Sequence, residues 1–464
     1  MRLLAVCLGL AAFSLLLPSV PSFDPWAWIV WGREVSSLDL NTVGGPSWKP
    51  LPVLFTTVFA PLGAIDDGVP PALWLVVARA GALLAMASAF ILAQRLAGPS
   101  RAVGIGAGLL AAGGLALTPQ WLRNAAHGNE VPLAVGLLFL AVNLHLDGKR
   151  SWALTLGFLA CLLRPEVFPF LAAYGVWMFR AAPERRPLIL GLAAALPLLW
   201  LVPEWIGSGN PLSAGAQARS EPSWSLSLTD QPWRAALERA HNLAGLPLEL
   251  GALTAAALAW RRRNSLDRVT LALAAVAVVW LVLVVVMVEA GFSGSPRYFM
   301  PAVVLGCVLA GVGAARLVEV VPGRAAAAAV AVLLAVAAGP WAIDHGRAFE
   351  AQAKQARSLD RSQRDLLTVV RRLGGEDAVT AKGMPRISPA FMTRMAWELE
   401  LHFEDIEKSP GLGYVFIADV PTPGRPAPNR KQLSRTERLV GAWHVRMPRK
   451  SPNVKDGHRT VTAQ

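Results

Sequence analysis

The chain has 464 residues, of which 54% are hydrophobic and only 16% are charged, and its mean hydropathy is +0.44. A soluble domain of this length does not need so much apolar material to fill its core, so composition excludes an ordinary soluble protein. The net charge of +13 would suggest nucleic acid as the partner of a soluble chain. Here the basic residues are spread over many short loops, so we expect a lipid bilayer and no nucleic acid as the partner.

Apolar stretches recur along the whole chain, most of them near the roughly 20 residues that cross the hydrocarbon core of a bilayer. They predict an all-α polytopic membrane protein with about eleven transmembrane helices, at 3–20, 70–93, 102–118, 131–146, 151–163, 167–179, 187–206, 246–260, 269–290, 299–317 and 325–343. Only Arg164-Pro165-Glu166 separates two short stretches, so one kinked span is an alternative there and the count holds to within one or two. The first stretch is compatible with a signal peptide, but Ser19-Val20-Pro21-Ser22 is a poor cleavage site and favours a retained anchor.

Basic residues gather in every second loop. After Arg2 the clusters are Arg95 and Arg101; Lys149 and Arg150; Arg180, Arg185 and Arg186; Arg261, Arg262, Arg263 and Arg268; and Arg316 and Arg324. By the positive-inside rule this alternation predicts a cytoplasmic N-terminus and an extracytoplasmic C-terminal part. The alanine-rich, arginine-over-lysine composition suggests a high-GC bacterium, so we expect a multi-pass protein of the bacterial plasma (inner) membrane.

The predicted outward loops are long and rich in tryptophan, proline and acids, whereas the inward ones are short and basic. The two largest outer loops are 21–69, whose tryptophans suit helices at the membrane interface, and 207–245. We therefore expect function on the outer side, within a transmembrane domain that spans residues 1–343.

The composition becomes charged at Asp344, and 344–447 is expected to form a small extracytoplasmic α/β domain. We expect a helix that stops at Gly374-Gly375, strands at 378–381, 414–418 and 440–445, and a helix from Ser388-Pro389 to about His402. The polar end, 448–464, is predicted to be disordered.

Asp24 follows the first apolar stretch in Ser22-Phe23-Asp24-Pro25-Trp26. A carboxylate at the membrane surface, partly desolvated by tryptophans, is suited to accept a proton from an acceptor hydroxyl as a general base. The same pattern is also typical of a helix N-cap, because proline is common at the first helical position. The two interpretations are compatible.

Lys49, in Trp48-Lys49-Pro50-Leu51-Pro52, precedes another apolar stretch. An ammonium at head-group level suits a lipid phosphate, and a snorkelling interfacial lysine is the alternative. Arg164 and Glu166 stand at a break within apolar flanks, where charges are costly unless they are paired or face a polar cavity. They are candidates for substrate binding or, alternatively, for a structural ion pair.

Arg297 and Tyr298, in Ser295-Pro296-Arg297-Tyr298-Phe299, begin a late apolar stretch on the same predicted side. The guanidinium suits bidentate contact with a phosphate or pyrophosphate, and an interfacial anchor is the alternative. Further outward polar residues are candidates to line the same cavity: Glu34, Asp39, His127 and Glu130.

An acid just after the first helix, then Arg33-Glu34, then Trp48-Lys49-Pro50-Leu51 before the next apolar stretch resembles the GT-C membrane glycosyltransferases. The branch in question is that of the aminoarabinose transferases and protein O-mannosyltransferases. The resemblance implies that Asp24 is the catalytic base and Lys49 the contact to the lipid phosphate. Arg-Pro-Glu at 164–166 and Arg-Tyr at 297–298 are similar to features of the same superfamily.

This sequence departs from the family pattern where Pro25 replaces a second acid and Leu51-Pro52 replaces Pro-Leu. The first departure weighs against a metal-assisted variant. No metal-ligand spacing, Walker loop or Rossmann glycine pattern is found, and Cys7, Cys161 and Cys307 lie in apolar runs. We therefore expect no cofactor and no metal ligands.

The resemblance implies a glycosyltransferase that moves a sugar from a polyprenyl-phosphate donor to an unidentified extracytoplasmic acceptor. Two other classes of protein stay open. A transporter or flippase predicts polar residues near the bilayer midplane, with Arg79 and Glu289 as candidates. A non-enzymatic cell-envelope scaffold predicts that Asp24, Lys49 and Arg164 are dispersed in space.

Overall fold

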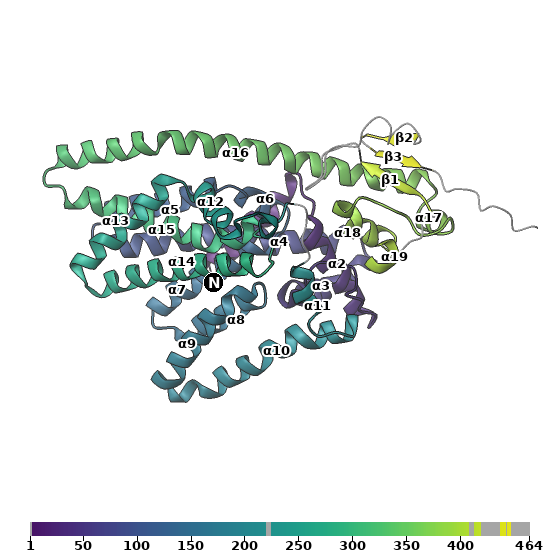
Figure 1. Cartoon of the computed structure of the whole chain (residues 1–464), viewed down its shortest axis with the longest axis horizontal. Coiled ribbons are helices and arrows are strands. Elements are labelled where there is room, and N and C mark those ends of the chain that lie inside the picture. The colour runs from purple at the N-terminus through teal and green to yellow at the C-terminus, as the bar shows by residue number, and fades with distance from the viewer. Residues whose placement is uncertain (1, 220–223, 408–412, 419–436, 442, 447–464) are drawn as a thin grey trace, which may run out of the picture. The chain divides into compact units, whose positions relative to one another are not determined.

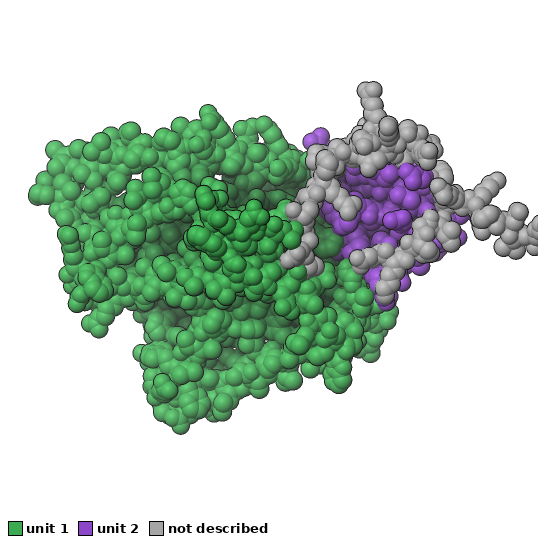
Figure 2. Space-filling view, in the orientation of Figure 1, with its two compact units in different colours: residues 1–360 green, residues 361–464 purple. Residues whose placement is uncertain are grey.

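The computed structural model describes residues 2–219, 224–407, 413–418, 437–441 and 443–446. It divides into two compact units, residues 1–360 and residues 361–464, which Figure 2 colours separately. Unit 1 is built from helices throughout its described residues, as the composition predicts for a chain in lipid.

Unit 1 contains helices α1 to α15 and the first part of α16, and Figure 1 labels all of them except α1. Their bounds are α1 Arg2–Phe13, α2 Phe23–Ser36, α3 Pro50–Phe59, α4 Val69–Ala97, α5 Arg101–Leu117, α6 Trp121–Ala126, α7 Glu130–Leu146, α8 Arg150–Cys161, α9 Phe168–Ala181, α10 Arg186–Ser208, α11 Ser213–Ala218, α12 Pro232–Ala244, α13 Leu246–Arg262, α14 Ser265–Glu289, α15 Pro296–Val320 and α16 Arg324–Arg372. Short 3-10 turns, η1 Ser14–Leu16, η2 Ala60–Ala64, η3 Pro165–Val167, η4 Pro183–Arg185 and η5 Leu226–Leu228, join several of them.

Five helices of the described chain are long and apolar enough to cross a membrane, and a sixth span is counted if the bent pair α12 and α13 is taken as one. Other apolar helices, among them α1, α5 and α7, are shorter than 18 residues. The chain is thus an α-helical, multi-pass membrane protein, and the number of eleven spans stays a prediction. The arginine-proline-glutamate break does separate two helices, α8 and α9.

Small residues let the central helices approach closely. A Cβ at Gly81 on α4 would lie 2.6 Å from the Cα of Leu133 on α7, and a Cβ at Gly251 on α13 would lie 2.8 Å from the Cα of Ala310 on α15. Such contacts are the usual way that helices associate in lipid, where no hydrophobic force drives them together. The α4–α7 contact fixes the N-terminal end of α7, which carries Glu130.

The tryptophans of the first outer segment lie inside the protein, which corrects their predicted place at the membrane interface. Trp26, Trp28 and Trp31 of α2 are fully buried, and Trp48 is 3% exposed. The ring centroids of Trp31 and Trp48 are 5.5 Å apart, and those of Trp28 and Trp74 are also 5.5 Å apart. Aromatic packing therefore holds α2 and the segment before α3 in the core, next to the polar residues that they carry.

Helix α16 runs without a break through residue 344, where the sequence predicted a domain boundary, and the division between the compact units lies at 360/361 within this helix. It ends at Arg372 before Gly374 and Gly375, as predicted. Unit 2 adds α17 Glu376–Thr380, α18 Pro389–Glu398, α19 Phe403–Glu407, and an antiparallel sheet of β1 Val415–Ala418, β2 Glu437–Val440 and β3 Trp443–Arg446 in the order β1-β3-β2.

Three details of unit 2 differ from the sequence prediction. Residues 376–380 form a helix instead of a strand, with Glu376 and Asp377 in a first turn where acids favour the helix dipole. The last strand, predicted at 440–445, is a hairpin that turns at Gly441, whose φ is +52°. The helix from Ser388-Pro389 ends at Glu398. The strand predicted at 414–418 is confirmed, and the tail 448–464 lies outside the described residues.

Candidate active site

Asp24 lies in the first turn of α2. The N-cap position of this helix belongs to Ser22, whose carbonyl oxygen accepts the Trp26 amide at 3.0 Å, so Asp24 is not the N-cap residue. Its carboxylate turns instead to Arg297 at the start of α15, and the two side chains form an ion pair. The Asp24 side chain is 16% exposed and that of Arg297 is 32% exposed. The pair is therefore reachable by a ligand.

Lys49 stands immediately before α3 and points into the protein. Its ammonium lies 3.2 Å from Oε1 of Glu130 and donates a 3.1 Å hydrogen bond to the carbonyl oxygen of Leu163. The amide of Leu51 donates to the carbonyl oxygen of Leu162, which ties the start of α3 to the end of α8. Burial lowers the pKa of Lys49 from its ordinary value, and the charge of Glu130 acts against this shift. A snorkelling lysine would extend its ammonium towards the membrane surface, whereas the ammonium of Lys49 points inward and is paired with Glu130.

Glu130 is the centre of a buried ionic network. It is fully buried at the first residue of α7, and its Oε1 is 3.1 Å from Nη1 of Arg164 as well as 3.2 Å from Lys49. Nη2 of Arg164 is 2.6 Å from Oε1 of Glu166, and both of these side chains are also buried. Charges withdrawn from water in this way are tolerated only when they are paired.

Tyr298 connects this network to the Asp24–Arg297 pair. The guanidinium of Arg164 lies over the Tyr298 ring, 5.2 Å from its centroid, and Arg297 is the preceding residue of α15. The backbone oxygen of Tyr298 accepts a 2.8 Å hydrogen bond from Nε1 of Trp280 on α14. Three acids and three bases thus meet in one cluster that comes from α2, α7, η3, α15 and the segments before α3 and η3. We call it the charged cluster: Asp24, Lys49, Glu130, Arg164, Glu166, Arg297 and Tyr298.

The charged cluster has unused hydrogen-bonding capacity. Within the described residues, Oε2 of Glu130, Oε2 of Glu166 and Nε of Arg164 are buried and have no hydrogen-bond partner. Buried polar atoms are nearly always paired, so such atoms indicate places for water or a polar ligand. No group of three or more His, Cys, Asp or Glu side chains in the described part of the chain is placed to hold a metal ion.

Three further candidates make their described contacts outside the charged cluster. Oε2 of Glu34, in the last turn of α2, accepts the Asn41 amide at 3.0 Å, and the amide of Asp39 donates to the Glu34 carbonyl oxygen, so both residues stabilise the turn after α2. His127 supports the approach to Asp24: its Nδ1 is 3.0 Å from the carbonyl oxygen of Val20, and its own carbonyl oxygen accepts the Ser22 amide. Burial lowers the pKa of His127 to about 4, so the ring is neutral at pH 7 and its Nδ1–H donates.

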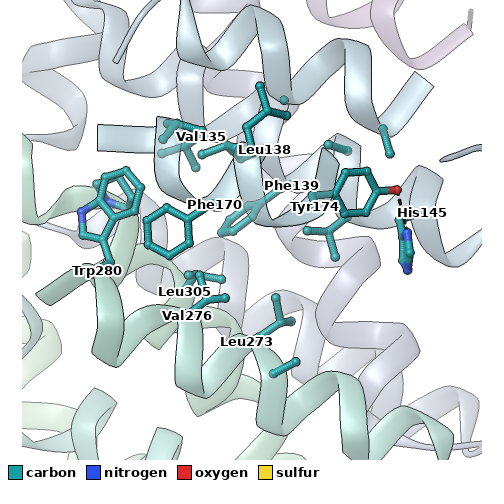
Figure 3. Close-up of a pocket in the computed structure, with 18 of the residues that line it drawn as sticks. Val135, Leu138, Phe139, His145, Phe170, Tyr174, Leu273, Val276, Trp280 and Leu305 are labelled. Carbon is teal, nitrogen blue, oxygen red and sulfur yellow. Dashed lines mark hydrogen bonds between the residues drawn. The ribbon is translucent and has the colours of Figure 1, made fainter. Parts of the chain in front are cut away.

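A large apolar cavity begins beside the charged cluster. It has a volume of about 470 Å³ and lies between α7, α8, α9, α14 and α15. Figure 3 shows Phe170 and Trp280 at one end, with centroids 5.3 Å apart, and the hydrogen-bonded pair His145 and Tyr174 at the other. Val167, which follows Glu166 directly, also lines it. The described residues that line this cavity include no Asp, Glu, Lys or Arg.

Sequence reasoning missed the importance of two residues. Glu130 was expected only as a possible lining residue, yet it contacts both Lys49 and Arg164. Its one signal in the sequence is an acid at the start of an apolar helix, directly after the N-cap Asn129. Trp280 lies in the middle of an apolar stretch, and nothing in its sequence context marks its contact with Tyr298.

No protein-family model and no curated protein matches this chain. Among solved structures, the chain is similar to ArnT from Cupriavidus metallidurans in the apo state and to the same protein bound to undecaprenyl phosphate. Each comparison has 15% sequence identity and a TM-score of 0.49, and covers 86% of this chain and 84% of the other. At that level the similarity assigns no function or site residue to this chain.

Proposed function

We propose that this protein is a membrane glycosyltransferase of the GT-C type, which transfers a sugar from a polyprenyl-phosphate donor to an acceptor on the extracytoplasmic side. The proposal places it in a bacterial plasma membrane with its N-terminus in the cytoplasm, as the distribution of basic loops predicts. The observation that carries it is the meeting of Asp24 with Lys49, Arg164 and Arg297, which are far apart in the sequence, at one end of an apolar cavity.

The cations of the charged cluster suit a lipid phosphate. Lys49 and Arg297 are its more exposed cations, and they offer a point charge and a planar fork of donors, respectively. Arg164 is buried between Glu130 and Glu166, so its role is to hold Glu130 and Tyr298 in place. The negative charge that develops on the departing phosphate would be stabilised by Lys49 and Arg297.

The pairing of Asp24 with Arg297 implies that the donor binds before Asp24 can act as a base. While Arg297 holds the carboxylate, Asp24 accepts hydrogen bonds from the guanidinium instead of from a sugar acceptor. A donor phosphate competes for the same guanidinium. Binding of the donor therefore frees Asp24 to act as the general base.

The transfer step then balances as a single displacement. The acceptor oxygen bonds to the anomeric carbon as its proton passes to Asp24, and the bond from that carbon to the phosphate oxygen breaks. The electron pair of the broken bond stays on the phosphate, which leaves with its polyprenyl chain. Attack opposite the leaving group inverts the anomeric configuration.

The apolar cavity provides a place for the chain of the donor. Its lining is aliphatic and aromatic apart from His145, and its outer end lies next to Glu166 and Tyr298. With its phosphate at the charged cluster, the donor would place its polyprenyl chain directly in the apolar cavity. The hydrophobic effect favours this removal of the chain from water.

The transporter and scaffold hypotheses receive less support. The guanidinium of Arg79 donates to the carbonyl oxygens of Ser14 and Ala126 and so joins helix ends. Glu289 accepts the Trp233 amide at the start of α12. Both candidate pathway charges thus have structural roles. Of the residues that a scaffold would disperse, Lys49 and Arg164 both contact Glu130, and Asp24 pairs with Arg297, which precedes Tyr298 under the Arg164 guanidinium.

The test is the variant Asp24→Asn in nanodiscs, supplied with polyprenyl-phosphate-linked pentoses and hexoses and a cell-envelope extract as acceptor. Release of polyprenyl phosphate is measured. Loss of a general base lowers the rate by about 10² to 10⁴. Asp67→Asn, an exposed acid of the same outer segment, is the matched control and should keep full activity. Full activity of Asp24→Asn would exclude the assigned base, and no release by the unmodified protein with any donor would exclude the function.

A further inference from the structure

A second group of cations lies at the ends of α8 and α9 that are away from the charged cluster: Arg150 begins α8 and Arg180 stands in the last turn of α9. Helix α7 has 17 residues from Glu130 to Leu146, about 25 Å at 1.5 Å per residue, which approaches the ~30 Å of a bilayer hydrocarbon core. Helix α9 likewise leads away from Glu166 towards Arg180. The far ends of both helices therefore lie near the opposite membrane surface.

Two hollows meet at this far end, and Trp177 lines both. One is the distal end of the apolar cavity, where His145 and Tyr174 form their 2.9 Å hydrogen bond. The other is an open hollow of about 620 Å³ along α9, lined by Ala173, Val176, Trp177, Arg180 and Ala181. Apolar positions along one side of a helix, ending in an arginine, suit an acyl chain with its head group at the arginine.

Cations without an acidic partner surround Trp177. The guanidinium of Arg150 lies over its ring, 5.1 Å from the centroid, and Arg180 shares the hollow with it. In the described contacts neither arginine is paired with a carboxylate, and Lys149 and Arg186 are not either. The acids nearest to these cations in the sequence form ion pairs with other arginines: Asp147 with Arg95 at 2.7 Å and Glu184 with Arg185 at 3.3 Å.

The positive-inside rule accounts for arginines in these two loops, but not for the placement of Arg150 over the Trp177 ring and of Arg180 in the same hollow as Trp177. Arg263 offers the contrast. Its guanidinium lies over Trp260, 4.5 Å from the ring centroid, in another basic loop, yet neither residue lines either of the two hollows. The hollow is lined by α9 alone, and Arg150 at the start of α8 places a second cation over its Trp177. Clustered cations at a membrane surface bind anionic lipid head groups.

We propose that Arg150, Trp177 and Arg180 form a binding site for an anionic phospholipid of the leaflet opposite the charged cluster. The phosphate lies between Arg150 and Arg180, and one acyl chain follows Ala173 and Val176 along α9. This site is distinct from that of the proposed sugar donor, and it does not depend on the proposed function.

The experiment uses the full chain in nanodiscs of phosphatidylcholine with or without phosphatidylglycerol. Retained lipid is counted by native mass spectrometry after detergent extraction, and tryptophan quenching by chain-brominated phosphatidylglycerol is measured in parallel. The double variant Arg150→Gln/Arg180→Gln should retain several-fold less phosphatidylglycerol than the unmodified protein. The quenching due to Trp177 is the part of the total quenching that is lost in Trp177→Phe. This part should also be smaller in the double variant than in the unmodified protein.

Arg263→Gln is the matched control, because it removes a cation that lies over a tryptophan but lines neither of the two hollows described here. It should retain phosphatidylglycerol like the unmodified protein. Equal retention by the double variant would overturn the site, as would an equal loss in the control, which would indicate only surface charge. Binding of inorganic phosphate without any quenching of Trp177 by the brominated chains would overturn the lipid as the ligand. Thermal unfolding of each variant verifies that it is folded.

Discussion

Lys49 and Arg164 contact the same carboxylate oxygen, Oε1 of Glu130, at 3.2 and 3.1 Å. One fully buried acid therefore fixes the positions of two cations that come from different segments of the chain. Removing the negative charge leaves two cations facing each other in a dry environment, where like charges repel strongly. The stability of this part of the molecule should consequently depend on Glu130 more than on any exposed acid.

We expect Glu130→Gln to lower the free energy of unfolding by about 3 kcal/mol, the usual cost of breaking a buried ion pair. Thermal unfolding in one detergent measures this loss. Glu238→Gln is the control, because Glu238 pairs with Arg234 on α12 with both side chains more than half exposed. Such exposed pairs contribute well under 1 kcal/mol. Similar melting of the two variants would contradict a central role for Glu130.

Lys49 should determine the affinity for a lipid phosphate. Lys49→Gln should weaken binding of a polyprenyl phosphate about 10- to 150-fold, the range for loss of a charge-assisted contact of roughly 1.5–3 kcal/mol. Because burial lowers the pKa of Lys49, the unmodified protein should lose affinity in the alkaline range, at a lower pH than an ordinary lysine would. The variant should lack that step. Titration of polyprenyl phosphate at several pH values tests both statements, and an unchanged affinity would remove Lys49 from the site.

The apolar cavity should hold the chain of the donor. Val276→Trp fills part of the space that Figure 3 shows between α7, α9 and α14, and it should raise the KM for long-chain donors. Donors with short, water-soluble chains should be affected less. Val278→Trp, on the same helix at a position that is 60% exposed, is the control. It should leave the KM for long-chain donors and the KM for short-chain donors unchanged. An equal effect on short and long donors would indicate damage to the charged cluster instead.

His127 should make stability depend on pH. Burial favours the neutral ring and lowers the pKa to about 4, so the unfolded chain binds a proton that the folded chain does not. The contribution of His127 to the free energy of unfolding is complete above about pH 6.5, the pKa of histidine in the unfolded chain. It is lost as the pH falls towards 4.

From these values, His127 accounts for a loss of about 2 kcal/mol between pH 7 and pH 5. Melting of the unmodified protein and of His127→Gln over this range isolates the effect, because both proteins share every other titrating group. The difference between their stabilities should narrow by this amount at pH 5. A constant difference would mean that His127 stays exposed to water.

The sequence identified the candidate site residues, but it did not predict which side chains each of them contacts. Asp24, Lys49, Arg164 and Arg297 were identified because each stands at the end of an apolar stretch, and the structure brings all four together. Whether Asp24 was an N-cap or a candidate base could not be decided locally. The carboxylate points to Arg297, which lies 273 residues further along the chain, so only the tertiary placement of the start of α15 next to Asp24 answers that question.

Sequence alone determined that the chain is helical and lies in lipid, because hydrophobic length and backbone hydrogen bonding admit few other structures in a bilayer. Tertiary structure decided what the polar residues contact. Trp26 and Trp31 are suited by composition to either a membrane interface or a core, and the neighbouring helices buried them. Glu130 became the centre of the charged cluster because close packing of α4 on α7 fixes its helix, and charges far apart in sequence interact only when folding makes them neighbours and removes the water between them.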